Sequence, residues 1–409
     1  MPLFLTRPLL ILAAIAVPLA LLEVAARLAI DPRAVAERLL HDADDRDAAP
    51  RAQALDDQRV ILHPYFGYVV DPRAPSINPY GFFQAEPMTT RTPDRFVIAF
   101  FGGSVADQVF SLGGPALIAA LEAAPAFAGR RIELVSTALG GYKQPQQLLV
   151  LAGLLALGAQ FDAVVALDGF NEIDGAADNV QDGVNPYFPH NWHLHARRAL
   201  DSRATALMGQ VESTRAARAA LRDRFARQPL ARSALWLWIW QLLDRQRAAA
   251  LGEQMRALDA ALAGARTSPQ VTGPPALFAD QDAMVVDFVE VWARAALEMH
   301  NLSEGQGILF LHFLQPNQYL AGSKTLTAEE RRRAWDPDVA EAGRVARGYP
   351  LLSARGRELS DQGVDFHDLT MLFRDEPGSI YSDPCCHYNQ RGAELVAQAI
   401  AAALIARQE

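Results

Sequence analysis

Cysteine is almost absent from this sequence, which has 409 residues and only two cysteines, the neighbours Cys385 and Cys386. So small a number excludes a framework of several disulfides and a zinc site built from four thiolates. In an oxidising compartment the two thiols could close a strained vicinal disulfide. Because disulfide geometry disfavours adjacent partners, we favour two reduced, packed side chains.

An excess of positive charge is also missing. The formal net charge is −9, which argues against nucleic acid as a partner and against a polybasic membrane-surface protein. No lysine follows Gly102-Gly103 at the spacing of a phosphate-binding loop, and we expect no cofactor. Hydrophobic residues make up 50% of the chain, enough to bury one large core or two smaller ones.

The N-terminus carries an apolar segment. A single basic residue, Arg7, precedes the charge-free run Pro8–Leu22, and Glu23 follows. The run is short for a membrane-spanning helix, which needs about 17–25 residues, unless the helix continues beyond Glu23. A cleaved signal peptide and a buried core helix are the alternatives. We expect residues 1–30 to be an uncleaved anchor, with the rest of the chain in the periplasm or outside the cell.

Apolar runs alternate with helical segments along the body of the chain. The expected strands are Phe96–Phe101, Ile132–Ser136, Ala163–Leu167, Ile308–Leu314 and Val364–Leu369. Helices are expected at Ala116–Leu121 and Gln146–Leu157. This alternation predicts an α/β fold in which helices cover both faces of a mainly parallel sheet of about five strands. Ligands then bind at the carboxyl ends of the strands.

Two further segments interrupt this pattern. Residues 31–94 read as a spacer and an N-terminal extension that packs on the domain at 95–409. Residues 175–302 read as a helical insertion between the third and fourth strands. Its Trp236-Leu-Trp238-Ile-Trp240 motif could bind sugar rings or a bilayer as part of a lid or platform. Helix core packing is the interpretation that the spacing favours.

Chemistry-bearing residues follow several of the expected strands. Ser104 stands where the first strand turns into a helix, so its hydroxyl can project at the sheet edge. Near the C-terminus, Asp383 and His387 can act as an orienting acid and a general base. Gly141 and Asn171 follow the next two strands and can supply a backbone and a side-chain donor to an oxyanion. Together these residues predict a serine hydrolase.

The four blocks resemble those of the SGNH, or GDSL-type, hydrolase superfamily. The matching blocks are Phe101–Ser104, Ala138–Tyr142, Asp168–Glu172 and Asp383–Gly392, within about Arg95–Asp174 and Gly307–Arg407. The resemblance implies a three-layer α/β/α flavodoxin-like sandwich. It also implies that Ser104 is the nucleophile, and that the Ser104 amide, the Gly141 amide and the Asn171 side chain form the oxyanion hole.

The chain departs from the family pattern at two points. The aspartate that precedes the serine in the family is Gly103 here. The family separates its Asp and His by two residues, whereas three lie between Asp383 and His387. Either a turn around Pro384 absorbs the extra residue, or another acid, Asp375 or Glu376, supports His387.

The resemblance and the expected location imply an esterase that removes O-acyl groups from envelope or exported polysaccharide. The expected partners are an acylated carbohydrate or small ester and, through the N-terminal helix, the membrane. An O-acyltransferase using the same residues and an inactive SGNH-like scaffold or glycan-binding protein are the alternatives. We expect no metal site, although His190, His193 and His195 could contribute ligands if His193 and His195 shared one face of a strand. Gln315–Gln318 could line the cleft or form a simple turn.

Overall fold

The computed structural model describes residues 6–33, 35–36, 39, 60–83, 85–200, 202–227, 233–263 and 269–408. The chain divides into two compact units. A helical unit combines Met1–Gln58 with Arg197–Arg266, and a sheet unit combines Arg59–Ala196 with Thr267–Glu409. The insertion expected at 175–302 therefore contributes to both units. Much of the spacer expected after residue 30 lies outside the described residues.

The sheet unit contains a five-stranded parallel sheet with the order β4-β3-β5-β6-β7. Its strands are β3 (Arg95–Gly102), β4 (Arg131–Ser136), β5 (Ala163–Asp168), β6 (Leu309–Leu314) and β7 (Asp365–Asp368). Numbered along the chain, the strands lie in the order 2-1-3-4-5. All five predicted strands are confirmed to within about two residues. The unbroken apolar runs of β3, β5 and β6 mark strands that are buried on both faces, whereas β4 and β7 at the sheet edges are partly exposed. β5 is buried throughout.

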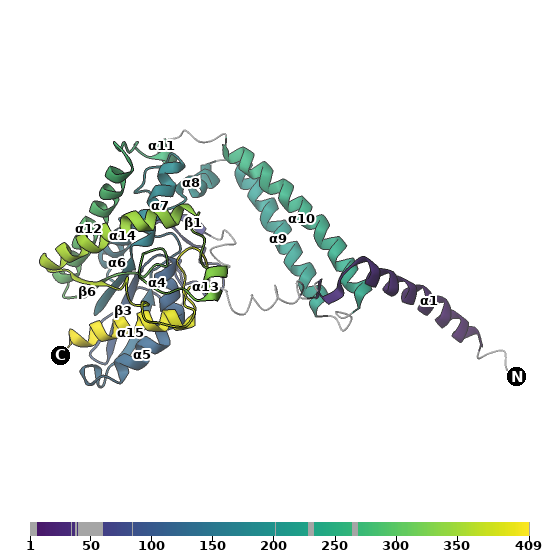
Figure 1. Ribbon diagram of the computed structural model, residues 1–409, viewed down its shortest axis with the longest axis horizontal. Coiled ribbons are helices and arrows are strands. Elements are labelled where there is room, and N and C mark those ends of the chain that lie inside the picture. Colours follow the sequence, from purple (N-terminus) through teal and green to yellow (C-terminus); the bar gives the residue numbers. More distant parts are fainter. Residues whose placement is uncertain are drawn as a thin grey trace. The chain divides into compact units, whose positions relative to one another are not determined.

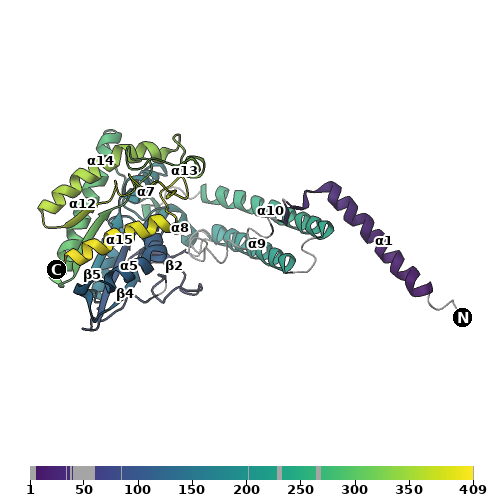
Figure 2. The same ribbon diagram turned by 60° about the horizontal axis from the view of Figure 1, so that its bottom comes forward.

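Helices cover the sheet in two groups, which Figures 1 and 2 show on opposite sides of it. The first group is α4 (Ser104–Gln108), η1 (Val109–Gly113), α5 (Gly114–Glu122) and α15 (Gln390–Ala406). The second is α6 (Gln146–Ala156), α7 (Phe170–Gln181), α12 (Gln281–Gly305) and α14 (Ala340–Asp361). In the first group α4 contacts β3 and β5, while in the second α12 and α14 contact β6. The α/β fold class is thus confirmed.

Among the described residues, Ser104–Glu122 is the one helical stretch that is long and apolar enough to cross a membrane. Half of the most apolar 18-residue segment of this stretch is buried inside the protein. Val105, Leu117 and Leu121 have almost no exposed surface, and α15 packs against both η1 and α5. The stretch is therefore a covering helix of the sheet, and Ser104 is its first residue.

A small antiparallel hairpin precedes the sheet, made of β1 (Val60–His63) and β2 (Gly67–Val70). It attaches to the loop after β4 through the Tyr142 hydroxyl, which donates to the Tyr68 carbonyl at 2.5 Å. Tyr68 in turn donates its hydroxyl hydrogen to the Gly140 carbonyl at 2.8 Å. This part of the predicted N-terminal extension does pack on the sheet unit. The remaining elements of this unit are η2 (Pro125–Phe127), α11 (Pro269–Thr272) and α13 (Ala328–Arg333).

The helical unit is formed by α1 (Thr6–Ala29), α9 (Ser202–Ala226) and α10 (Ala234–Ala263), while α8 (Trp192–Leu200) links the two units along the chain. α9 and α10 lie side by side in both views. The Glu23 carboxylate of α1 accepts hydrogen bonds from the Ala234 and Leu235 amides, both at 2.9 Å, at the start of α10. Trp240 is buried in the core of this unit and Trp236 stacks on Phe225. These two tryptophans therefore take part in helix core packing, the interpretation that their spacing in the sequence favoured.

Candidate active site

Ser104 is placed by the abrupt turn from β3 into α4. Gly102 has a φ of +148°, a conformation that side-chain-bearing residues rarely adopt. A Cβ on Gly103 would lie 2.1 Å from Asn171 Nδ2, so only glycine permits that amide to approach. The two glycines therefore let Asn171, from the start of α7, stand beside the serine. A side chain at position 103 would collide with this amide.

Ser104, His387 and Asp383 form a hydrogen-bonded chain. His387 Nε2 lies 2.7 Å from Ser104 Oγ, and His387 Nδ1 lies 2.5 Å from Asp383 Oδ2. A carboxylate at Nδ1 selects the tautomer that carries its proton there, which leaves Nε2 free to accept the serine proton. Residues 283 positions apart in sequence thus meet with the geometry that nucleophile activation requires.

The three residues between Asp383 and His387 form a turn around the carboxylate. Asp383 Oδ1 accepts amide hydrogens from Cys385, Cys386 and His387 at 3.0, 3.2 and 3.3 Å. Burial alone acts to raise the pKa of Asp383, but its hydrogen bonds and the His387 ring outweigh burial and lower it. The turn absorbs the extra residue in the Asp–His spacing while one oxygen remains for His387.

The two other acids considered for His387 lie in different interactions. Glu376 Oε1 accepts the Gly378 amide at 3.1 Å, and its other oxygen pairs with Arg391 at 3.4 Å. Asp375 makes no hydrogen bond or ion pair with His387. The imidazole instead has Asp383 on one nitrogen and Ser104 on the other. Asp383 is therefore the acid that the structure brings to the base.

Three hydrogen-bond donors, the Asn171 side chain and the amides of Ser104 and Gly141, have hydrogens that the described residues leave unused. Asn171 Nδ2 donates to the Tyr142 carbonyl at 2.9 Å, which uses one of its two hydrogens and leaves the other for a ligand. Among the described residues, neither the Ser104 amide nor the Gly141 amide has a hydrogen-bond acceptor. Gly141 has a φ of +78° in the turn after β4. These are the donors that an oxyanion hole requires.

Gln318, from the segment considered as a cleft lining or a turn, and two residues that the sequence analysis missed, Tyr319 and Gln108, hold the loop that carries His387. Gln318 Nε2 donates to the Asp383 carbonyl at 3.0 Å, and the Tyr319 hydroxyl donates to the Pro384 carbonyl at 2.7 Å. The Tyr388 amide donates to Gln108 Oε1 of α4 at 2.7 Å. The segment after β6 therefore supports the acid–base loop through Gln318 and Tyr319.

Glu330 is a second missed residue, completely buried at the base of the same loop. One of its carboxylate oxygens accepts the Ile380 and Tyr381 amides at 2.8 and 3.1 Å. The other accepts the Thr327 amide and pairs with Lys324 at 3.1 Å, and both charged side chains are 0% exposed. The motif Thr327-x-x-Glu330 is a capping box, so the sequence did carry a signal for this residue.

A buried carboxylate also joins the Gly141 and Asn171 loops. Glu172 Oε1 accepts the Gln144 amide at 2.9 Å and Oε2 accepts the Gly169 amide at 2.7 Å. Burial, followed by the charge of Asp168, raises the pKa of Glu172 to about 8. Because Glu172 is adjacent to Asn171 in α7, its hydrogen bonds set the position of the oxyanion donors relative to each other.

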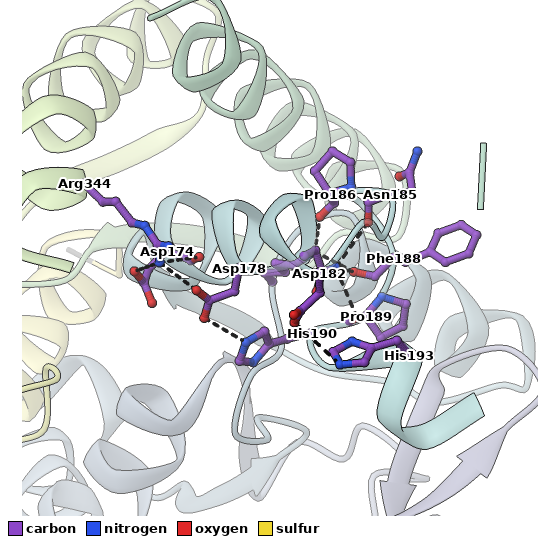
Figure 3. Close-up of polar contacts among 12 residues, drawn as sticks. Asp174, Asp178, Asp182, Asn185, Pro186, Phe188, Pro189, His190, His193 and Arg344 are labelled. Atoms are coloured by element: carbon purple, nitrogen blue, oxygen red, sulfur yellow. Dashed lines mark hydrogen bonds and ion pairs between the residues drawn. The ribbon is translucent and has the colours of Figure 1, made fainter. Parts of the chain in front are cut away.

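Histidines of the segment after α7 border the site. Figure 3 shows His190 directed at Asp178, with Nε2 and Oδ2 3.4 Å apart, while Arg344 bridges Asp178 and Asp174. His190 also lies against Gly141, since a Cβ there would be 3.0 Å from its Nδ1. His193 Nε2 lies 3.6 Å from Asp182 Oδ2. The side chain that packs against Gly141, His190, is therefore held by a network with Asp178 and Arg344.

The strand geometry considered for a histidine metal site is wrong. His193 and His195 belong to the helix α8, where residues two apart point to different sides. Among the described residues, the group whose atoms are near enough to hold a metal is Cys385, Cys386 and His387. Both nitrogens of His387 already contact Asp383 and Ser104, so a metal there would displace one of these contacts.

Comparisons with known proteins find no protein family that matches the chain and no curated protein that is similar to it. The functional interpretation therefore depends on the geometry of the site. That geometry contains a serine with a hydrogen-bonded base, a carboxylate on the other nitrogen of that base, and three donors with unused hydrogens. Such an arrangement can activate a hydroxyl for attack on a carbonyl and stabilise the negative charge that develops.

Proposed function

We propose that this protein is a serine ester hydrolase of the SGNH type. The observation that carries the proposal is the chain from Ser104 Oγ through His387 to Asp383, with contacts of 2.7 and 2.5 Å. The approach of the Asn171 amide to Gly103, next to Ser104, supports it independently. The 2-1-3-4-5 strand order matches that of flavodoxin-like folds, which supports assignment of the sheet unit to that arrangement.

The reaction proceeds through an acyl-enzyme. His387 Nε2 takes the Ser104 hydroxyl proton as Oγ attacks the ester carbonyl, and the Ser104, Gly141 and Asn171 donors bind the resulting oxyanion. Collapse breaks the bond to the alcohol, which leaves with the proton from His387. Water then attacks the acyl-enzyme, His387 takes its proton, and the carboxylic acid is released as Ser104 is regenerated.

The proposed site of action is the outer face of a membrane, with α1 as the anchor. The part of α1 that precedes the contact of Glu23 with α10, residues 6–22, has 17 residues, the lower end of the about 17–25 that a spanning helix needs. Val17, Leu21 and Val24 expose 56% or more of their surface, a costly arrangement in water. O-acyl groups on envelope or exported polysaccharide are accordingly the proposed substrates.

Hydrolysis of p-nitrophenyl acetate by the full-length protein in detergent tests the proposed activity. Ser104→Ala abolishes turnover while the Ser111→Ala control, in η1 of the same covering helix, retains it. Equal rates in the wild type and Ser104→Ala reject the proposal. An O-acetylated polysaccharide then tests the substrate class, and an added acceptor glycan separates release of acetate from acyl transfer.

Location is tested separately from activity. The full-length protein stays with the membrane fraction after carbonate extraction, whereas a variant without residues 1–30 is released. Retention of that shortened variant rejects α1 as the anchor. Protease accessibility in intact cells and in vesicles then reports on which side the sheet unit lies.

A further inference from the structure

The two cysteines lie in contact inside the turn that connects the acid to the base. Their Sγ atoms are 2.8 Å apart, about 0.8 Å longer than the ~2.05 Å of a disulfide bond. Both are free thiols. Cys386 is 1% exposed, whereas Cys385 is half-buried and can meet a reagent from solvent.

The same turn fixes the geometry of the catalytic acid. Asp383 Oδ1 accepts the amides of Cys385 and Cys386, while Oδ2 contacts His387 Nδ1. The Cys386 amide belongs to the peptide bond between the two cysteines. Any covalent closure of the two sulfurs forms a ring that contains this amide, so closure changes a hydrogen bond that holds Asp383.

We propose that Cys385 and Cys386 are a reversible redox modification site, oxidised to a vicinal disulfide that lowers the activity of the adjacent acid–base pair. The effect on activity rests on the proposed hydrolase function, whereas formation of the disulfide is independent of that function. The oxidant is a disulfide, either of a small molecule or of another protein, and it reacts first with the half-buried Cys385.

The chemistry is ordinary thiol–disulfide exchange. Cys385 thiolate attacks one sulfur of the oxidant, forms a mixed disulfide and releases one thiol. Cys386 then loses its proton and attacks Cys385 Sγ, which forms the Cys385–Cys386 bond and releases the second thiol. Two protein thiols are oxidised and one oxidant disulfide is reduced to two thiols. Burial raises the pKa of the Cys386 thiol, so ring closure is faster at alkaline pH.

Strain makes the modification reversible. Adjacent Cα atoms are about 3.8 Å apart across a trans peptide, while disulfides usually join Cα atoms about 4.4–6.8 Å apart. A strained disulfide is more easily reduced, which is the behaviour of a labile site and not of a structural bridge. Closure also pulls on the Cys386 amide and thereby turns Asp383 away from His387.

The test incubates the full-length protein in detergent with oxidised glutathione, and then with dithiothreitol, at pH 8. Peptide mass spectrometry is expected to show loss of two hydrogen atoms from the peptide that contains both cysteines. Hydrolysis of p-nitrophenyl acetate is expected to fall at least 10-fold and to recover on reduction. The activity of the Cys385→Ser variant, compared with its own activity before oxidation, is expected to be insensitive to oxidised glutathione.

Two results overturn the inference. A peptide that stays fully reduced, or that stops at the glutathione adduct, rejects the disulfide. A vicinal disulfide with unchanged hydrolysis rejects its effect on the acid–base pair. If the reduced protein lacks hydrolase activity, the proposed function fails, and with it the effect on activity, while the mass measurement still decides whether the two cysteines are a redox site.

Discussion

The Asn171 side-chain amide occupies the space that any side chain at Gly103 would need. A Cβ on Gly103 would lie 2.1 Å from Asn171 Nδ2 and 3.2 Å from the Tyr142 carbonyl oxygen. The first and third sequence blocks of the site are therefore fitted to each other. Replacement of one side of this contact disturbs the other.

Gly103→Ala is accordingly predicted to lower kcat for ester hydrolysis by about 10²- to 10³-fold, which is the cost of losing one oxyanion donor. Thermal unfolding shows whether the variant remains folded. Gly343→Ala, where nothing lies within 4 Å of the added Cβ, is the matched control and keeps wild-type kcat. A Gly103→Ala enzyme with full activity shows that Asn171 does not act from this position.

Asp383→Asn is predicted to lower kcat by about 10²- to 10⁴-fold, because an amide at His387 Nδ1 no longer selects the productive tautomer. Asp375→Asn removes a neighbouring acid without a contact to His387 and serves as the control, with activity within about twofold of wild type. A reversed pattern, in which Asp375→Asn is inactive and Asp383→Asn is active, contradicts the assignment.

Glu330→Gln is predicted to destabilise the loop that carries His387. The change removes the buried negative charge that pairs with the Lys324 ammonium and leaves it with carbonyl acceptors alone, which costs about 3 kcal/mol in the free energy of unfolding. Burial acts to raise the pKa of Glu330, but its backbone hydrogen bonds outweigh burial and lower it. The carboxylate therefore stabilises the fold above its unfolded pKa of about 4.5, and that stabilisation is lost as the pH falls further.

Urea unfolding of the full-length protein in detergent between pH 3 and pH 7 measures both effects. The surface variant Glu329→Gln is the adjacent control, since this side chain is 53% exposed. Wild type and Glu330→Gln are expected to differ most at pH 7 and to converge at low pH. A constant difference across this range contradicts the linkage.

Glu172 is predicted to give the opposite pH dependence. Its pKa is raised to about 8, so its protonated form is favoured by folding. The contribution is fully present below pH 4.5 and is lost as the pH rises to about 8, with a slope of at most about 1.4 kcal/mol per pH unit. Glu172→Gln removes this component, so the slope difference between variant and wild type isolates it. Identical slopes from pH 5 to pH 8 contradict the assignment.

The sheet and the contact among Ser104, His387 and Asp383 could be predicted because both leave local signals. Apolar runs such as Phe96–Phe101 mark buried parallel strands, and parallel strands bring their carboxyl ends to one edge. Ser104 and Asn171 follow two such strands and do meet there. The sequence therefore predicted that residues far apart in the chain would share a site.

The support of the site could not be predicted in the same way. The turn in which Asp383 Oδ1 accepts three amides is a property of backbone geometry, and the spacing alone left Asp375 and Glu376 open. The contact of Glu23 with the start of α10 joins residues more than 200 positions apart without a local pattern. Long-range polar contacts of this kind appear only when the chain is folded.

Covalent labelling of Ser104 tests the central claim most directly. The account predicts that a fluorophosphonate adds one equivalent to the full-length protein in detergent, on the peptide that contains Ser104. Ser104→Ala is expected to abolish the adduct, and His387→Ala is expected to slow its formation strongly because the hydroxyl loses its base. A folded protein that takes up no label, or equal labelling of wild type and Ser104→Ala, contradicts the account.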